Sequence, residues 1–301
     1  MSKPISEEEA RKYYQNMRSK TPEEKRVWMA RLLGRDELLT PSEYGEVLFF
    51  GQEAIKEQIE PFLARDENFP HTLILGESGI GKTQLAKWIA SKRRQEFDEL
   101  LCPVKPEAIP DRGIVLLDEA HRQSHPEWLF PIMESNRLTV LAATTRPEVL
   151  EPAFRNRFFL VLHLTKMSDE SLMEMTKTLL PGVTEESADI YAGAAAGNPR
   201  QLERICVVAK EVGVNDPGSV LATVRISADG LTDFQIRLLE ALRSANRPIG
   251  LGTLSVLMYS DEQTIREAER HLIENQLIAL RTNGRALTRK GVRYLEVRDA
   301  S

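Results

Sequence analysis

Long apolar runs are missing from this sequence of 301 residues. None approaches the ~20 residues of a membrane-spanning helix, and the polar start offers no signal segment, so no membrane contact or secretion is predicted. Cysteines are scarce as well, and the two present, Cys102 and Cys206, lie far apart outside any partner motif. We therefore expect small buried thiols in a reduced, cytoplasmic protein rather than a disulfide framework.

An excess of positive charge is also missing, since the formal net charge is −5. The chain as a whole is not a polycation, and any contact with nucleic acid must come from a local basic patch. Aromatic residues make up only 6%, charged residues make up 28%, and neither repeats nor low-complexity segments occur. This composition excludes fibrous, membrane and disordered classes, and the length suits a globular protein of two or three domains.

The order of apolar and polar segments predicts a helical extension over residues 1–46, an α/β core over 47–166, a small helical unit over 167–225 and a last domain over 226–301. In the core, short apolar runs alternate with helical segments, which favours βαβ units and a mostly parallel sheet between helices. The expected strands are Thr72–Leu75, Ile114–Leu117, Leu138–Ala142 and Phe159–Leu164.

The last domain is predicted to be a winged helix. Three helical stretches precede two short runs, Leu277–Arg281 and Arg285–Thr288, which flank Asn283-Gly284. Asn-Gly between such runs is the strongest short-range signal for a β-hairpin, and this hairpin would form the wing.

A glycine-rich motif of the form G-x-x-x-x-G-K-[ST] follows the first expected strand and opens a helix over Lys82–Arg93. Backbone N–H groups of such a loop close around phosphates, and the helix N-terminus adds partial positive charge. Lys82 would neutralise the β- and γ-phosphates of ATP, and the Thr83 hydroxyl would ligate Mg²⁺. The motif consists of Gly76, Glu77, Ser78, Gly79, Ile80, Gly81, Lys82 and Thr83.

Two carboxylates end the expected strand at Ile114–Leu117. Asp118 would hold Mg²⁺, mainly through water, and Glu119 would polarise the attacking water. The structural alternative is an acidic strand end that caps the next helix. The following strand ends in two threonines, of which Thr145 is predicted to reach the γ-phosphate and Thr144 is the second choice; threonine is also an ordinary strand residue.

Arginines complete the predicted site. A site with only the motif lysine and Mg²⁺ lacks a donor for the charge that develops on the γ-phosphoryl group. We expect Arg155 of a neighbouring subunit to supply it, with Arg157 as runner-up and a surface or interface salt bridge as the alternative. Asn198 and Pro199 fit the N-cap and first position of a helix. The helix dipole disfavours Arg200 in that first turn, so a nearby anion such as the nucleotide is predicted.

The C-terminal segment 277–295 contains five basic and no acidic residues. Arg281 and Arg285 flank the Asn-Gly turn, where they could bind DNA phosphates in a salt-dependent, sequence-independent way. The helix around 261–274, which is the recognition helix by position, mixes arginines with glutamates, so base reading is not expected. The alternative is a winged helix that binds protein and has a solvated basic face.

In this order, the motifs resemble the AAA+ class and, within it, the RuvB family of Holliday-junction motors. The resemblance covers residues 47–295 and implies an ATP pocket that includes Phe49 and Phe50, a ring or filament with sites at subunit interfaces, and a winged helix that touches DNA. The runs that carry it are Phe49–Gln52, Asp118–Arg122, Leu129–Glu134, Ala143–Arg146, Phe154–Phe158, Gly197–Arg200, Pro248–Leu251 and Arg281–Arg285.

Three departures from the family are visible. RuvB carries a long β-hairpin, which binds the RuvA partner, between the equivalents of Leu138 and Leu141, where this chain has only two residues. The segment between Lys82 and Asp118 is short and leaves little room for elaborate pore loops. The extension over 1–46 has no counterpart, and we expect it to bind a protein partner or to aid assembly.

Two functions fit these features. One is an ATP-hydrolysing DNA motor or remodeller, and the other is an ATP-gated assembly factor on DNA, such as a helicase or clamp loader or a transposition regulator. A protein remodeller is disfavoured because no aromatic-apolar-glycine pore loop follows the first helix. The run Asp118–His121 also matches a DEAH-box helicase, but such an enzyme needs a second RecA-like domain, for which the chain has no room.

Overall fold

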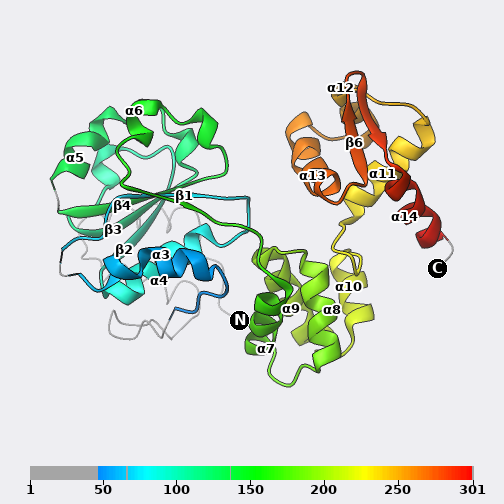
Figure 1. Ribbon diagram of the computed structural model, residues 1–301, viewed down its shortest axis with the longest axis horizontal. Helices are drawn as coiled ribbons and strands as arrows, with labels where there is room; N and C mark the ends of the chain where they lie inside the picture. Colours follow the sequence, from blue (N-terminus) through cyan, green and yellow to red (C-terminus); the bar gives the residue numbers. More distant parts are fainter. Residues whose placement is uncertain (1–46, 66, 136, 300–301) are drawn as a thin grey trace, which may run out of the picture.

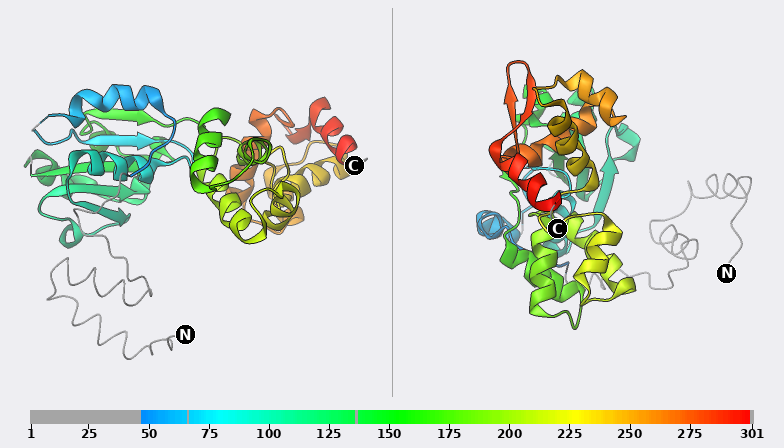
Figure 2. Two further views of the ribbon diagram at one scale, coloured as in Figure 1. Left: turned by 90° about the horizontal axis from the view of Figure 1, so that it is seen from below. Right: turned by 90° about the vertical axis from the view of Figure 1, so that its right-hand side faces the viewer.

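The structure, a computed structural model, describes residues 47–65, 67–135 and 137–299. The helices predicted within residues 1–46 lie outside this described part. Figure 1 shows three bodies: a sheet with its helices, a helical bundle, and a C-terminal body with a small hairpin. Both smaller bodies lie on the same side of the sheet body (Figures 1 and 2). In the described residues, no helix has the length and apolar character needed to cross a membrane.

The first body contains a five-stranded parallel sheet, as the alternation of apolar runs predicts. The strand order is β2-β3-β4-β1-β5, so β1 lies between β4 and β5, and β3 lies beside β4. The strands are β1 (Thr72–Leu75), β2 (Phe97–Leu101), β3 (Gly113–Asp118), β4 (Leu138–Thr144) and β5 (Leu160–His163).

Helices cover both faces of this sheet, which explains why β1 and β4 are buried along their whole length. On one face, α3 (Glu53–Leu63) and α4 (Lys82–Arg93) pack through Ile59, Leu85 and Ile89. The opposite face is covered by short helices that follow the strands. These are η3 (Ala120–Arg122), η4 (Pro126–Leu129), α5 (Phe130–Glu134) and α6 (Pro152–Arg155), and the connections on this side also contain η2 (Pro106–Ala108) and η5 (Pro147–Val149).

The connection from α5 to β4 is direct. Helix α5 ends at Glu134 and β4 begins at Leu138, so only residues 135–137 join them, and residue 136 is outside the described part. The long hairpin that RuvB carries between Leu138 and Leu141 is replaced here by continuous strand, because both residues belong to β4. The continuous strand agrees with the short spacing noted in the sequence.

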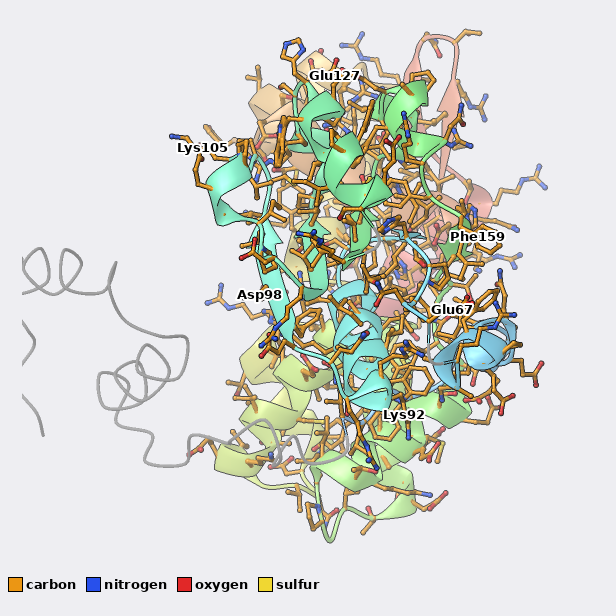
Figure 3. The ribbon with its side chains drawn as sticks, turned by 90° about the vertical axis from the view of Figure 1, so that its left-hand side faces the viewer. Glu67, Lys92, Asp98, Lys105, Glu127 and Phe159 are labelled. Atoms are coloured by element: carbon orange, nitrogen blue, oxygen red, sulfur yellow. The ribbon has the colours of Figure 1, made fainter. Side chains whose placement is uncertain are left out.

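Strand β2 was not predicted from the sequence. It forms the edge of the sheet and is only partly buried, because acidic residues interrupt its apolar pattern. Figure 3 shows Asp98 on this strand, at the opposite side of the view from Phe159, which precedes β5 at the other edge. An edge strand lacks the continuous apolar run by which the buried strands are identified.

The second body, here called the lid, is a four-helix unit with its own apolar core. Each helix begins at a side-chain N-cap, which accepts a hydrogen bond from the backbone N–H three residues further on. The helices are α7 (Asp169–Leu179), α8 (Glu185–Ala195), α9 (Pro199–Val212) and α10 (Pro217–Val224).

The third body is the predicted winged helix, with the hairpin β6–β7 beside helices that share one core. Gly284 opens β7 at φ 134, and a Cβ there would lie 2.3 Å from the carbonyl oxygen of Ile249. Only glycine allows this close approach, which ties the hairpin to the start of α12. The elements are α11 (Asp233–Ala245), α12 (Leu251–Met258), α13 (Glu262–Glu274), β6 (Ile278–Arg281), β7 (Gly284–Leu287) and α14 (Arg289–Asp299).

Candidate nucleotide site and winged-helix surface

The glycine-rich loop lies between β1 and α4, where the sequence predicts it. Gly79 and Gly81 have φ of 79° and 100°, and Gly81 caps α4 without any side-chain hydrogen bond. The first N–H groups of α4 thus have no side-chain cap of their own. A helix N-terminus of this kind, preceded by a glycine loop, fits the phosphates of a nucleotide.

Lys82 is held inside this loop. Its Nζ donates to the carbonyl oxygens of Gly76 at 3.0 Å and Glu77 at 2.8 Å, and the residue is 7% exposed. Burial lowers the pKa of Lys82, and the nearby carboxylates of Glu119 and Asp118 oppose that shift. A buried ammonium whose direct partners are neutral carbonyls is suited to accept phosphate oxygens as further partners.

The carboxyl ends of β1, β3 and β4 meet beside the loop, because these strands are neighbours in one parallel sheet. Asp118 ends β3, and its carboxylate accepts the N–H of Glu119. The backbone leaves the strand direction at Glu119, which has a φ of 50°. Its Oε2 lies 3.3 Å from His121 Nδ1. Burial lowers the pKa of His121, against the opposing effect of Glu119. The two carboxylates and Lys82 are therefore brought to one edge of the sheet.

The two threonines at the end of β4, Thr144 within the strand and Thr145 after it, have different surroundings. Thr144 is fully buried, and its hydroxyl bonds to His121 Nδ1 at 2.9 Å and accepts the N–H of Arg146. Thr145 lines the cavity that also contains Glu119. The geometry supports the first choice, Thr145, as the residue open to a nucleotide, and it places Thr144 behind His121.

The two candidate arginines lie around the end of α6 and are exposed. Arg157 is engaged within the chain: it pairs with Glu134, and its guanidinium lies 4.6 Å from the ring centre of Phe130. Arg155 has no ion-pair partner among the described residues. Of the two, Arg155 has the more available guanidinium for a neighbouring subunit.

The lid contacts the loop through the start of α9. Asn198 caps this helix, and Pro199 takes its first position, as the sequence predicts. The side chain of Asn198 donates to the carbonyl of Ser78 at 3.1 Å, and Arg200 Nη1 lies 3.5 Å from Ser78 Oγ. The predicted arginine is therefore brought to the glycine loop, where its charge disfavours protonation of Lys82.

Phe49 and Phe50 belong to the segment before α3, residues 47–52, here called the strap, and they pack on different bodies. Phe49 packs on the core beside Trp88, with ring centres 5.9 Å apart, and would lie 3.7 Å from a Cβ at Gly81. Phe50 packs on the lid. The strap thus bridges core and lid next to the glycine loop, which is consistent with the nucleotide pocket implied there.

A cavity of about 990 Å³ joins the three bodies. The loop and Glu119 line one wall, the lid contributes Asn198 and Gln201, and the polar face of α13 lines another wall, with Arg266 and Arg270. The approach of α13 to the nucleotide side was not predicted. No sequence spacing could reveal it, because it depends on how the winged helix sits on the lid.

The predicted DNA contacts also differ from each other. Arg281 is exposed at the end of β6. Arg285 is instead mostly buried, and its Nε and Nη2 donate to both carboxylate oxygens of Glu269 at 2.7 and 2.9 Å. This bidentate pair raises the pKa of Arg285. Arg285 was predicted to reach DNA phosphates, but in this structure its guanidinium is already bound to Glu269 of α13.

Known proteins resemble this chain in sequence and fold. Residues 228–296 match the RuvB C-terminal winged helix domain. The RuvB subunit of the Holliday junction branch migration complex from Streptomyces coelicolor is 28% identical, over 83% of this chain and 84% of its own length. The subunit from Ehrlichia ruminantium is 26% identical, over 82% and 89%. Two structures of Thermotoga maritima RuvB match with TM-scores of 0.71 and 0.72, at 25% and 26% identity, over 82% of this chain and 95% of theirs.

The chain is a RuvB-like AAA+ protein. It combines the AAA+ core with a C-terminal winged helix. The resemblance seen in the sequence is confirmed, as is the fold class.

Proposed function

We propose that this RuvB-like chain hydrolyses ATP with Mg²⁺ at the subunit interfaces of a ring or filament, and that hydrolysis is coupled to DNA. The observation that carries the proposal is the convergence of Lys82, Asp118, Glu119 and Thr145 at one sheet edge, with Arg200 of the lid beside them. Its relatives are named for Holliday-junction branch migration, and branched DNA is therefore the first substrate to test.

The chain's own residues would act as follows. Lys82 would donate to phosphate oxygens in place of the loop carbonyls, and Glu119 would orient and deprotonate the attacking water. When bound, Mg²⁺ would neutralise charge on the β- and γ-phosphates, and Thr83 and Asp118 offer it the hydroxyl and carboxylate oxygens that it prefers. Arg155 from a second subunit would stabilise the charge that develops on the γ-phosphoryl group.

On the DNA side, Arg281 would make the wing's phosphate contact, with affinity that falls as salt rises. Arg285 would act by holding the wing against α13. The N-terminal extension as a binding site for a protein partner, and the cytoplasmic location, remain predictions from the sequence.

A second function is favoured by the continuous strand β4, which has no hairpin between Leu138 and Leu141. An ATP-gated assembly factor would show DNA-stimulated hydrolysis without moving a branch or separating strands. Branch-migration and strand-displacement assays distinguish it from a motor.

The decisive measurement is the steady-state ATPase rate with and without duplex, single-stranded and four-way-junction DNA. Glu119→Gln should lower kcat by about 10²–10⁴-fold, because it removes the general base. Glu148→Gln is the matched control: Glu148 lines the same cavity but is exposed and takes no part in the proposed chemistry. A rate that no DNA changes would contradict the DNA coupling, and an active Glu119→Gln variant would contradict the proposed base.

A further inference from the structure

Hydrogen bonds run from the glycine loop to the winged helix through the start of α9. Asn198 donates to the carbonyl of Ser78 in the loop, and its Oδ1 accepts the N–H of Gln201 at 3.3 Å. The carboxamide nitrogen of Gln201 then donates to two carbonyls, Ala194 at the end of α8 at 2.6 Å and Gly230 at 3.3 Å. Gly230 belongs to the turn over residues 227–232 that leads into α11.

These hydrogen bonds from Ser78 through Asn198 and Gln201 to Gly230, here called the relay, are tightly packed at both ends. A Cβ at Gly79 would lie 2.6 Å from Asn198 Oδ1, and a Cβ at Gly230 would lie 2.6 Å from the Ala196 Cβ. The N–H of Arg200 also donates to the carbonyl of Gly79 at 3.3 Å. Because there is no free space at either end, a shift of the loop has to move the start of α9, and a shift of α9 has to be felt at the turn.

The turn, in its own right, positions the winged helix. Its Ser227 closes the turn by bonding Leu231 through both backbone and side chain, and Tyr294 of α14 reaches the same hydroxyl at 3.5 Å. Thr232 caps α11 in a capping box with Gln235, whose side chain donates to the carbonyl of Ala268 in α13 at 3.2 Å. The turn therefore contacts both the first helix of the domain and, through Gln235, the helix that lines the nucleotide cavity.

We propose that Gln201 is a positioning residue that transmits the nucleotide state of the glycine loop to the winged helix, and so sets how DNA affinity depends on ATP. The proposal rests on the proposed DNA-coupled ATPase function. Gln201 suits this role because its amide donates to two elements at once, the lid at Ala194 and the turn at Gly230. Coupling of this kind is reciprocal, so ATP should change DNA affinity by the same factor by which DNA changes ATP affinity.

The test measures the dissociation constant of a fluorescein-labelled duplex with and without ATP, in a Glu119→Gln background that holds ATP unhydrolysed. The ratio of the two constants is compared between Gln201, Gln201→Leu and Gln201→Glu. Leucine removes both donors, and glutamate keeps the shape but places a carboxylate against two carbonyl oxygens. Gln263→Leu is the control, because Gln263 lines the same cavity but its side chain bonds only to Glu267 among the described residues.

We expect an ATP effect on DNA affinity of about 5–150-fold in the parent and the control. In both Gln201 variants the ratio should fall to within about twofold of one. The DNA affinity without nucleotide and the ATP affinity should both stay within about threefold of the parent. Merely structural damage would instead lower these two affinities. Melting temperatures show which variants fold, and either variant suffices. A parental ratio that persists in a folded Gln201 variant overturns the relay alone. A ratio of one in the parent overturns the DNA coupling as well.

Discussion

His71 illustrates how one partly buried residue can fix the protonation state that the fold requires. Its Nδ1 accepts the N–H of Val140 at 2.9 Å, so this nitrogen carries no proton, and its Nε2 bonds to the carbonyl of Met133 at 2.7 Å. Acceptance at Nδ1 requires the neutral imidazole, whereas the Nε2–H bond to Met133 can also form when the ring is protonated. Burial lowers the pKa of His71, and the bond to Met133 only partly opposes the shift.

The consequence is a pH-dependent stability. The unfolded chain takes up a proton on this histidine near pH 6.5, and the folded chain does so only at lower pH, so stability is lost as pH falls below about 6.5. His71→Gln should therefore flatten the fall in melting temperature between pH 7 and pH 5. His163→Gln, at an exposed position on β5, should leave the fall unchanged. An unaltered slope in His71→Gln would contradict this assignment.

At the scale of elements, the wing and α13 act as one unit through the pair of Arg285 and Glu269. Glu269 is 5% exposed, and no other cation has a hydrogen bond or ion pair to it in the described part of the chain. Removing one partner leaves a buried charge unpaired, which costs more than the pair itself contributes.

Arg285→Ala should accordingly lower the free energy of unfolding by about 3 kcal/mol, as measured by urea denaturation. Arg281→Ala should leave that free energy unchanged, weaken duplex binding and reduce its salt slope by about one. A double Arg285→Met, Glu269→Met variant should regain most of the lost stability. If Arg285→Ala kept full stability but bound DNA more weakly, Arg285 would be a DNA contact rather than a structural residue.

Elements with a strong local signal were predictable from the sequence. The glycine loop, α4, the buried strands and the hairpin all follow from motifs or apolar runs, and Asn198 was identified as a cap from its own short segment. Strand β2 has no such run, since acidic residues interrupt it. The Glu269–Arg285 pair and the bond from Gln201 to Gly230 join residues 16 and 29 positions apart, and only the packing of the helices determines them.

At the scale of the whole assembly, the proposed site divides between two subunits, with Glu119 from one and Arg155 from the next. Each single variant, Glu119→Gln or Arg155→Ala, should be nearly inactive in ATP hydrolysis. An equimolar mixture should recover activity, because a site in an Arg155→Ala subunit becomes complete beside a Glu119→Gln neighbour. Random assembly gives about a quarter complete interfaces and a corresponding fraction of the parental rate.

Arg157→Ala serves as the comparison in the same mixing experiment. Because Arg157 pairs with Glu134 in its own chain, its loss should affect activity less than that of Arg155. If mixing with Glu119→Gln restored activity to Arg157→Ala but not to Arg155→Ala, Arg157 would be the arginine supplied by the neighbouring subunit.

The position of α13 has a consequence for how this chain can meet a double helix. A helix that reads bases must enter a major groove about 12 Å wide and 8.5 Å deep. The polar face of α13 is the face that would enter, yet in this conformation Gln263, Arg266 and Arg270 on that face form a wall of the nucleotide cavity. Groove entry and this docked position therefore exclude each other, and a docked winged helix can follow only the sugar-phosphate backbone.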